Sequence, residues 1–391
     1  MRIAVIGQKG IPAIHGGVER HVHDLALRLA KNNQEVIVYA RKWYTKKDQD
    51  FSFAGVLIKH LPSLHTKHFD AISHTLFSTL HAMVNKVDVI HYHGIGPSLL
   101  AWIPRLFSRH ILVISTFHSI DRYDQKWNAL AKMILRLAER CACTFPHKTI
   151  TISKELKKYC LNEFYKETTY IPNGIESYKI DNTINKIAEF GLKKNEYLVM
   201  VSRLIPTKGA HILIEAFNNL KKNHSDNNLV KNLKLAIVGG SVYTNDYVKS
   251  LHQLGASNND VIFTDFRSDQ TLHQLYAHSL ALVHPSFNEG LPLTVLEAMS
   301  FSKPVLATNI VEHQELINDK NFLFKENNVL DLETMLWKFL NMTKEEQRLA
   351  GKINKKKVEK QYHWDNIVPQ IIEIYEEGER KNVLITAEAI S

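Results

Sequence analysis

Two glutamates stand eight residues apart in the segment Asn288–Met299, which reads NEGLPLTVLEAM. Such a pair can serve as acid and base on a sugar, can accept hydrogen bonds from ligand hydroxyls, or can form the polar edge of an ordinary helix. Pro292 suits the first turn of a helix, so we expect Glu289 in a loop and Glu297 within the helix. On a helix, a rise of ~1.5 Å per residue would part the carboxylates by ~12 Å, whereas a retaining glycosidase pair stands ~5 Å apart. The spacing therefore favours a clamp on two ends of one ligand.

Two cations flank a proline turn in the segment Ser202–Phe217, SRLIPTKGAHILIEAF. Arg203 ends an expected strand, and Lys208 opens an expected helix five residues later. Both cations can converge on one place, where they would neutralise a diphosphate. Two unrelated surface cations are the alternative interpretation.

A glycine-bearing loop lies between the first expected strand and the first expected helix, in Gly7–Arg20, GQKGIPAIHGGVER. Gly16 and Gly17 precede the helix, where unpaired N–H groups favour an anion and glycine lets it approach the backbone closely. The spacing is not GxGxxG, and no acidic residue is placed for a dinucleotide ribose, so a dehydrogenase is disfavoured. A plain turn is the alternative.

The histidines and cysteines do not form a recognisable metal site in the sequence. His91 and His93 share one face of a strand, but no carboxylate or third histidine is recognisably placed beside them, so we interpret them as core or edge histidines. Cys141, Cys143 and Cys160 give an odd count without a CxxC spacing, which predicts reduced structural cysteines. We therefore expect no metal and no cofactor.

Short apolar runs alternate with amphipathic segments along most of the chain, and this alternation must position the candidate residues. The expected strands of the first half are Arg2–Gly7, Glu35–Ala40, Gly55–Leu61, Val87–His93, Ile111–Thr116 and Lys148–Ser153. Those of the second half are Tyr197–Leu204, Leu233–Gly239, Val261–Phe266, Leu280–Ser286 and Pro304–Thr308. The pattern predicts an α/β protein of two doubly wound, Rossmann-like domains with parallel sheets, facing each other across a cleft.

A length of 391 residues also favours two domains. We expect an N-terminal domain at 1–172, a linker region at 173–195 and a C-terminal domain at 196–360. The remaining residues, 361–391, have an amphipathic pattern interrupted at Pro369 and end in a loosely held tail.

The net charge of +9 calls for an acidic partner. The bases are dispersed and no zinc-finger or aromatic RNA-binding signature occurs, so a phosphate-bearing substrate or an anionic membrane is favoured over nucleic acid. The segment Gly96–His110 suits an interfacial helix on an anionic leaflet, although a core helix with a basic outer end is an equal alternative. No apolar run reaches the ~18 residues of a spanning helix, and Met1–Gly10 lacks the features of a signal peptide. We expect a cytoplasmic protein.

The motif NEGLPLTVLEAM resembles the E-x7-E motif of retaining glycosyltransferases with the GT-B fold, specifically family 4. The resemblance covers nearly the whole chain. It includes HGGVER, SRLIPTKG and the strand-end VGG at Val238–Gly240. The stretch Ser115–Asn128, STFHSIDRYDQKWN, resembles that of a bacterial polysaccharide and lipopolysaccharide subgroup.

The resemblance implies roles for the residues of the second half. Arg203 and Lys208 would bind the diphosphate of the donor. Glu297 would bind the nucleotide ribose, and Glu289 the hydroxyls of the transferred sugar. The cations would then supply most of the catalysis, because they stabilise the leaving diphosphate.

The resemblance also implies roles for the first half. Gly16 and Gly17 would lie against the donor phosphate or the acceptor, and His118 would face the donor sugar. Ser119 stands where the family pattern has glycine. The helix at His363–Tyr375 would cross back onto the first domain.

The implied function is transfer of a hexose, N-acetylhexosamine or rhamnose from a nucleotide-diphosphate donor to a growing glycan, with retention. The expected partners are a nucleotide sugar and a lipid-linked glycan acceptor of lipopolysaccharide, O-antigen or capsule synthesis, at the cytoplasmic face of the inner membrane. The alternatives are a GT-B nucleotide-sugar epimerase and a non-catalytic sugar-nucleotide-binding subunit.

Overall fold

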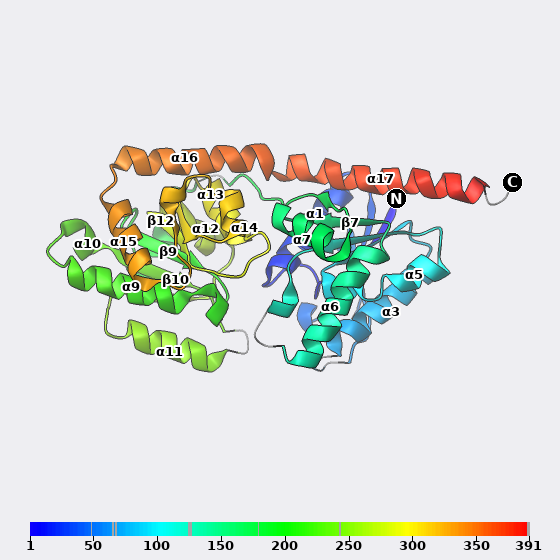
Figure 1. Ribbon diagram of the computed structural model, residues 1–391, viewed down its shortest axis with the longest axis horizontal. Helices are drawn as coiled ribbons and strands as arrows, with labels where there is room; N and C mark the ends of the chain where they lie inside the picture. The colour runs from blue at the N-terminus through cyan, green and yellow to red at the C-terminus, as the bar shows by residue number, and fades with distance from the viewer. Residues whose placement is uncertain are drawn as a thin grey trace. The chain divides into compact units, whose positions relative to one another are not determined.

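The computed structural model describes residues 1–47, 49–64, 66, 69–123, 127–178, 180–241 and 244–388, with the backbone alone at 269 and from 379 onward. Contacts within the chain divide it into two compact units (Figure 1). Unit 1 comprises Met1–Gly174 together with Trp364–Ser391, and unit 2 comprises Ile175–His363. Each unit is an α/β sandwich, so the predicted fold class is confirmed.

Unit 1 is built on a sheet in which all neighbouring strands run parallel except β3 and β4. Its strands are β1 (Arg2–Ile6), β2 (Glu35–Ala40), β3 (Phe51–Phe53), β4 (Val56–His60), β5 (Val89–His93), β6 (Leu112–Phe117), β7 (Lys148–Thr151) and β8 (Thr169–Tyr170). The strand order is β3-β4-β2-β1-β5-β6-β7-β8. The order reverses between β1 and β5, and ligands of open α/β sheets bind outside the carboxyl ends of strands at such a switch point.

Helices cover both faces of this sheet because alternate residues of each strand point to opposite sides. The helices are α1 (Gly17–Lys31), α2 (Lys42–Thr45), α3 (Asp70–Val84), α4 (Ile95–Ser98), α5 (Trp102–Phe107), α6 (Ala129–Thr144), α7 (Lys154–Phe164) and α17 (Trp364–Glu388), with a 3-10 turn η1 (Asp121–Tyr123). Ile3 and Val5 pack with the apolar stripes of α1 and α17. Ala4 and Ile6 face the other way, into a second cluster that includes residues of α3.

Helix α17 belongs to unit 1 and completes its core. Trp364, Ile367, Ile371 and Tyr375 are buried in the same cluster as α1. The helix is continuous through Pro369, where the amphipathic sequence pattern is interrupted. Proline has no N–H to donate to the carbonyl four residues earlier, which here is that of Asp365. Asp365 lies in the first turn of the helix, so the loss of this one hydrogen bond leaves the other backbone hydrogen bonds of α17 intact. The predicted tail lies within residues whose side chains are outside the described part.

Unit 2 has a fully parallel sheet. Its strands are β9 (Tyr197–Val201), β10 (Lys234–Val238), β11 (Val261–Asp265), β12 (Ala281–His284), β13 (Val305–Thr308) and β14 (Leu323–Phe324). They are ordered β11-β10-β9-β12-β13-β14. This is the dinucleotide-fold order, and its switch point lies between β9 and β12.

The helices of unit 2 cover both faces of its sheet (Figure 1). Strands β9, β10, β12 and β13 are almost entirely buried. They are α8 (Asn185–Ala188), α9 (Ala210–Asn223), α10 (Asn228–Asn232), α11 (Asn245–Gly255), α12 (Asp269–His278), α13 (Leu293–Ser300), α14 (Val311–Leu316), α15 (Val329–Leu340) and α16 (Lys344–Gln361), with 3-10 turns η2 (Pro206–Lys208) and η3 (Lys320–Phe322). Buried strands of this kind read as continuous apolar runs, which is why the sequence marked them clearly.

The segment proposed as one interfacial helix is divided. Helix α4 ends at Ser98, and α5 runs only from Trp102 to Phe107. No described helix is both long and apolar enough to cross a bilayer.

Candidate functional site

In unit 2 the loops that follow β9 and β12 pack against each other at the switch point. Gly209 ends the η2 turn with φ 70° and precedes α9. A Cβ atom placed on Gly209 would lie 2.3 Å from the carbonyl oxygen of Pro285, so only glycine allows this approach. The phenylalanine at 287 donates its backbone N–H to the carbonyl of Thr207 at 3.1 Å. The two loops therefore hold each other in register.

Lys208 and Glu289 form an ion pair across these loops. The ammonium Nζ of Lys208 lies 2.5 Å from Oε1 of Glu289, and it also donates to the carbonyl of Asn288 at 3.2 Å. His284, the last residue of β12, donates from Nε2 to the same carboxylate oxygen at 2.9 Å. The side chains of Lys208 and Glu289 are 12% and 11% exposed. Two residues predicted to touch one ligand thus already contact each other.

This environment keeps Glu289 ionised. Burial alone would raise the pKa of Glu289, but the Lys208 ammonium and the His284 hydrogen bond outweigh it and lower the pKa well below its usual value. A carboxylate of this kind accepts hydrogen bonds and cannot donate a proton near neutral pH. The carboxylate is therefore suited to accept hydrogen bonds from ligand hydroxyls and is poorly suited to act as a general acid.

Arg203 differs from Lys208 in being an uncommitted cation. It follows β9 at the same switch point, and its side chain is exposed. Among the described residues its side chain forms no hydrogen bond and no ion pair, while its backbone carbonyl accepts from the N–H of Ile205 at 3.0 Å. A guanidinium in this state is available for the two-pronged contact that arginine makes with phosphate oxygens.

Glu297 lies on α13, and Glu289 lies in the loop before it, as the sequence predicted. The helix begins at Leu293, so Pro292 is its N-cap and not part of its first turn. Oε2 of Glu297 accepts a hydrogen bond from the hydroxyl of Tyr276 at 2.9 Å. Burial, followed by the negative charge of Glu297, raises the pKa of Tyr276 well above its usual value, so Tyr276 stays a donor.

In unit 1, Gly16 and Gly17 begin α1, but the anion position beside them is filled. Gly16 has φ 106° and is the N-cap of the helix. The carboxylate of Glu19 lies over Gly16: a Cβ atom placed on Gly16 would be only 2.0 Å from Oε2 of Glu19. A carboxylate at a helix N-terminus is stabilised by the helix dipole. It would repel a phosphate at the same place, so the geometry favours neutral hydroxyls there.

His118 follows β6 and belongs to a cluster of buried imidazoles. Its Nε2 lies 3.2 Å from Nδ1 of His93, at the end of β5. The ring of His21, from α1, lies 5.1 Å from that of His118 and 5.6 Å from that of His93, centroid to centroid. His91 is fixed from both sides, by the hydroxyls of Tyr375 and Thr116.

All four imidazoles of this cluster are neutral at pH 7. Burial lowers the pKa of His21 to about 4 and, with help from His21, that of His91 to about 3. Burial and the neighbouring imidazoles also lower the pKa values of His93 and His118 well below 6.5. Nε2 of His93 is buried without a hydrogen-bond partner among the described residues. An unpaired N–H costs more than an unpaired lone pair, so we infer that Nδ1 of His93 donates to His118, which then carries its own proton on Nδ1.

Three of these residues also have the donor set of a metal site. One nitrogen each of His21, His93 and His118 lies within 4.8 Å of the other two. Neutral imidazoles are zinc ligands, and Zn–N bonds of ~2.05 Å would place nitrogens about 3.3 Å apart. The mutual hydrogen bond of His93 and His118 already uses one nitrogen of each ring. The sequence did not place His21 or His118 beside His93, and the structure does. The expectation that no metal takes part stays a prediction.

The stretch after His118 is held by local polar contacts. The Ser119 hydroxyl donates to Oδ1 of Asp121 at 2.5 Å, so serine fits here without a glycine. Arg122 pairs with the buried Glu139 at 3.1 Å and donates to the hydroxyl of Tyr159 at 3.0 Å. These contacts make Arg122 an anchor for the loop. The part of the motif at residues 124–126 is outside the described residues.

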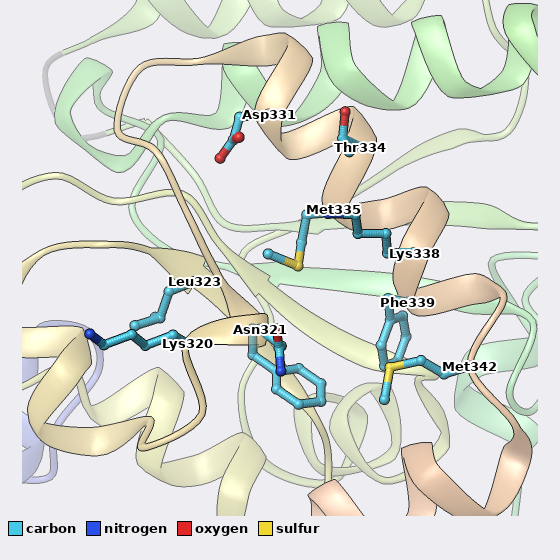
Figure 2. Close-up of a pocket in the computed structure, with 10 residues that line it drawn as sticks. Lys320, Asn321, Leu323, Asp331, Thr334, Met335, Lys338, Phe339 and Met342 are labelled. Atoms are coloured by element: carbon cyan, nitrogen blue, oxygen red, sulfur yellow. The ribbon is translucent and has the colours of Figure 1, made fainter.

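A cavity of about 390 Å³ lies elsewhere in unit 2, between η3, β14 and α15 (Figure 2). Met335 and Phe339 line it from α15, Met342 from the segment after α15, and Lys320 and Asn321 from the turn. β14 is the edge strand, two strands from the switch point. None of the residues predicted from the sequence lines this cavity, so it is separate from the candidate site.

Sequence reasoning missed three residues that support the site. His284 could have been found, because it is a polar residue at the end of an apolar strand, directly before the loop of Glu289. Glu19 could also have been found, because it lies within the motif HGGVER. Tyr276 lies on α12, remote from any motif, and has no signal in the sequence.

Comparison with known proteins identifies the two units separately. The model of Glycosyltransferase Family 4 matches residues 15–177. The model of Glycosyl transferases group 1 matches residues 182–357.

Two relatives with similar sequence are named as glycosyltransferases of microbes. An uncharacterized glycosyltransferase of Methanocaldococcus jannaschii is 26% identical over 96% of this chain and 98% of its own length. The UDP-Gal:alpha-D-GlcNAc-diphosphoundecaprenol alpha-1,3-galactosyltransferase of Escherichia coli is 28% identical, over 62% of this chain and 64% of its own length.

Solved structures with the same fold cover nearly the whole chain. Sucrose-phosphate synthase from Thermosynechococcus elongatus has a TM-score of 0.81 at 19% identity, over 96% of this chain and 98% of its own. Anabaena HepE in complex with UDP and glucose has a TM-score of 0.78 at 21% identity, over 96% of this chain and all of its own. The chain therefore belongs to the glycosyltransferases, with a Family 4 domain followed by a group 1 domain on the GT-B fold.

Proposed function

We propose that this glycosyltransferase moves a hexose or related sugar from a nucleotide-diphosphate donor to a growing, lipid-linked glycan of bacterial surface polysaccharide, with retention at the anomeric carbon. The observation that carries the proposal is the switch point of unit 2. There an exposed, uncommitted cation, Arg203, accompanies a buried ammonium–carboxylate pair, Lys208 and Glu289, at the carboxyl ends of two parallel strands.

The proposed chemistry needs little from the protein beyond charge. A nucleoside diphosphate leaves readily once its developing charge is stabilised. Arg203 and Lys208 would supply that stabilisation, and the first turn of α9, directly after Lys208, adds its free N–H groups. No step in this scheme requires a proton from Glu289, which agrees with its depressed pKa.

The remaining residues would grip the donor and the acceptor. Glu289 would accept hydrogen bonds from the transferred sugar, and Glu297, oriented by Tyr276, from the nucleotide ribose. His118 would donate from Nδ1 to a sugar hydroxyl. Gly16 and Gly17 would approach the acceptor and not a phosphate, because the Glu19 carboxylate already lies at the helix start.

The donor and acceptor classes are supported by relatives. Anabaena HepE has been solved with UDP-glucose. The E. coli galactosyltransferase named above uses UDP-Gal and a diphosphoundecaprenol acceptor, and another E. coli relative is an O-antigen chain mannosyltransferase. These names motivate UDP-sugars as the first donors to test.

The test is a donor screen followed by turnover with and without acceptor. Purified protein is first screened by thermal shift against UDP-, GDP- and dTDP-sugars. The stabilising donor is then incubated with and without an undecaprenyl-diphosphate glycan, and the anomeric configuration of the product is read by NMR. Transfer only in the presence of acceptor is expected. Consumption of donor without acceptor would instead indicate an epimerase, and binding without consumption would indicate a non-catalytic subunit.

A further inference from the structure

In helix α3 of unit 1 polar side chains face the interior, and a row of apolar side chains faces solvent. Its buried residues are His74, Thr75, Ser78, Thr79 and Ala82. The large apolar residues Leu76, Phe77, Leu80 and Val84 are exposed, whereas Met83 packs against the second core cluster. The buried hydroxyls are satisfied: Thr75 and Ser78 donate to carbonyls of their own helix, and Thr79 bonds to the hydroxyl of Tyr92. The polar face of α3 therefore packs against the rest of unit 1 with its hydroxyls hydrogen-bonded, and the apolar face is exposed to solvent.

Exposure of the apolar residues increases toward the end of α3. Leu76 is 36% exposed, and Val84, the last helical residue, is 80% exposed. Phe77 and Leu80 lie between them on the same stripe. Exposing such a stripe forgoes about 25 cal/mol for each Å² of apolar surface that could be buried. Contiguous apolar surface of this kind marks an interaction site.

Helix α5 contacts α3 and repeats the pattern. Trp102 is 37% exposed and Phe107 is 72% exposed, with Leu106 between these values. The rings of Trp102 and Phe107 pack edge to face, with centroids 6.4 Å apart. We name the set Leu76, Phe77, Leu80, Val84, Trp102, Leu106 and Phe107 the α3–α5 face.

Basic residues border the exposed ends of both helices. Lys86 follows α3, and Arg109 follows α5; both are exposed. Between Ala71 and Ile120 the chain has one acidic residue, Asp88, and its carboxylate accepts a hydrogen bond from the backbone N–H of Arg2. The α3–α5 face therefore joins apolar surface to positive charge, with almost no negative charge in the segment.

We propose that the α3–α5 face docks unit 1 on an anionic phospholipid bilayer. The apolar side chains enter the boundary between headgroups and acyl chains, while Lys86 and Arg109 contact lipid phosphates. The choice of a bilayer rests on the lipid-linked acceptor proposed above, and the charge of the face supports it independently. A two-fold contact between two copies would place the same bases opposite each other, which the charge of this face disfavours.

The test measures binding of the full-length protein to vesicles in the absence of donor and acceptor. Wild-type protein should co-sediment with phosphatidylcholine–phosphatidylglycerol vesicles at low salt, and far less with pure phosphatidylcholine or at high salt. Val84→Asp and Phe107→Asp should each lower the partition coefficient at least tenfold. Lys86→Gln with Arg109→Gln should lower it about 30-fold, from ~1 kcal/mol per base and tenfold per 1.4 kcal/mol.

Matched controls come from unit 2. Leu330 on α15 is 71% exposed, so Leu330→Asp makes the same chemical change at equal exposure. Lys352→Gln with Lys356→Gln removes two exposed bases from α16. Wild-type protein that stays in solution with anionic vesicles at low salt would overturn the proposal, as would equal losses in the control variants. A dimer that the face variants convert to monomer, without vesicle binding, would also overturn it.

The outcome of this experiment can be distinguished from the outcome of the transferase test. Affinity for UDP and GDP is measured on the same variants by calorimetry, and it should be unchanged, since none of these residues belongs to the switch point of unit 2. Face variants that lose vesicle binding but keep normal nucleotide affinity would support the role of the α3–α5 face without testing the transferase proposal. Failure of wild-type protein to bind any nucleotide sugar concerns the transferase proposal alone.

Discussion

Removing the ammonium of Lys208 by Lys208→Met should destabilise unit 2 and raise the pKa of Glu289. Both side chains are nearly nine-tenths buried, and breaking a buried pair by removing one partner costs ~3–5 kcal/mol. The His284 hydrogen bond remains and offsets part of this loss. We therefore expect a cost of ~2–3 kcal/mol, which in a unit of this size lowers the unfolding temperature by roughly 4–12 °C.

Two further variants measure the coupling energy between Lys208 and Glu289. Glu289→Gln alone leaves the Lys208 ammonium without its counter-charge, and the double variant removes both charges. The double variant should be more stable than the sum of the two single effects predicts, by about 2 kcal/mol, because neither partner is left as an uncompensated buried charge. The unfolding of unit 2 is followed by differential scanning calorimetry. Additive effects within ~0.5 kcal/mol would refute the reasoning, since they would show that the pair is not coupled.

The same variants should lose transfer, because a charged hydrogen bond to phosphate is worth ~1.5–3 kcal/mol and Glu289 is proposed to grip the sugar. UDP or GDP affinity should fall about tenfold or more in Lys208→Met and change little in Glu289→Gln. Transfer at the wild-type rate in either folded variant would remove that residue from the site.

Three further predictions concern the other candidate residues. Glu297→Ala should weaken nucleotide binding at least tenfold, and Tyr276→Phe should do so less, by calorimetry; unchanged affinity in Glu297→Ala would contradict the ribose role. Unit 1 should lose stability as pH falls from about 6.5 toward 4, because the unfolded chain takes up protons that buried His21 and His91 do not, at ~1.4 kcal/mol per pH unit for each histidine; an unfolding temperature that stays constant from pH 7.5 to 5.5 would show that these imidazoles bind protons equally in the folded and unfolded states and would contradict their lowered pKa. Dialysis against a chelator should leave transfer unchanged, whereas stoichiometric zinc that His93→Ala loses would show a metal at the histidine cluster.

The fold could be predicted from the sequence because its signals are local. Buried parallel strands read as continuous apolar runs, and the turns between them carry glycine and proline at fixed places. The same signals placed Glu289 in a loop and Glu297 on a helix, as the structure shows.

What the sequence did not reveal depends on contacts between distant residues. The pairing of Lys208 with Glu289 joins positions 81 residues apart, and the histidine cluster joins three elements of unit 1. The apolar stripe of α3 has the period of a helix face that packs on a core, and it gives no indication of which side is buried. Tertiary structure decided that the hydroxyls go inward.

The return of the chain to unit 1 has a consequence for biosynthesis. Trp364 packs so closely on Gly174 that a Cβ atom there would lie 2.3 Å from its indole ring. The residues that fill this part of the core emerge from the ribosome roughly 190 positions after the rest of unit 1. Unit 2 is therefore complete while unit 1 still waits for its last helix, and a nascent chain stalled before Trp364 would expose an unfinished apolar surface to chaperones and proteases.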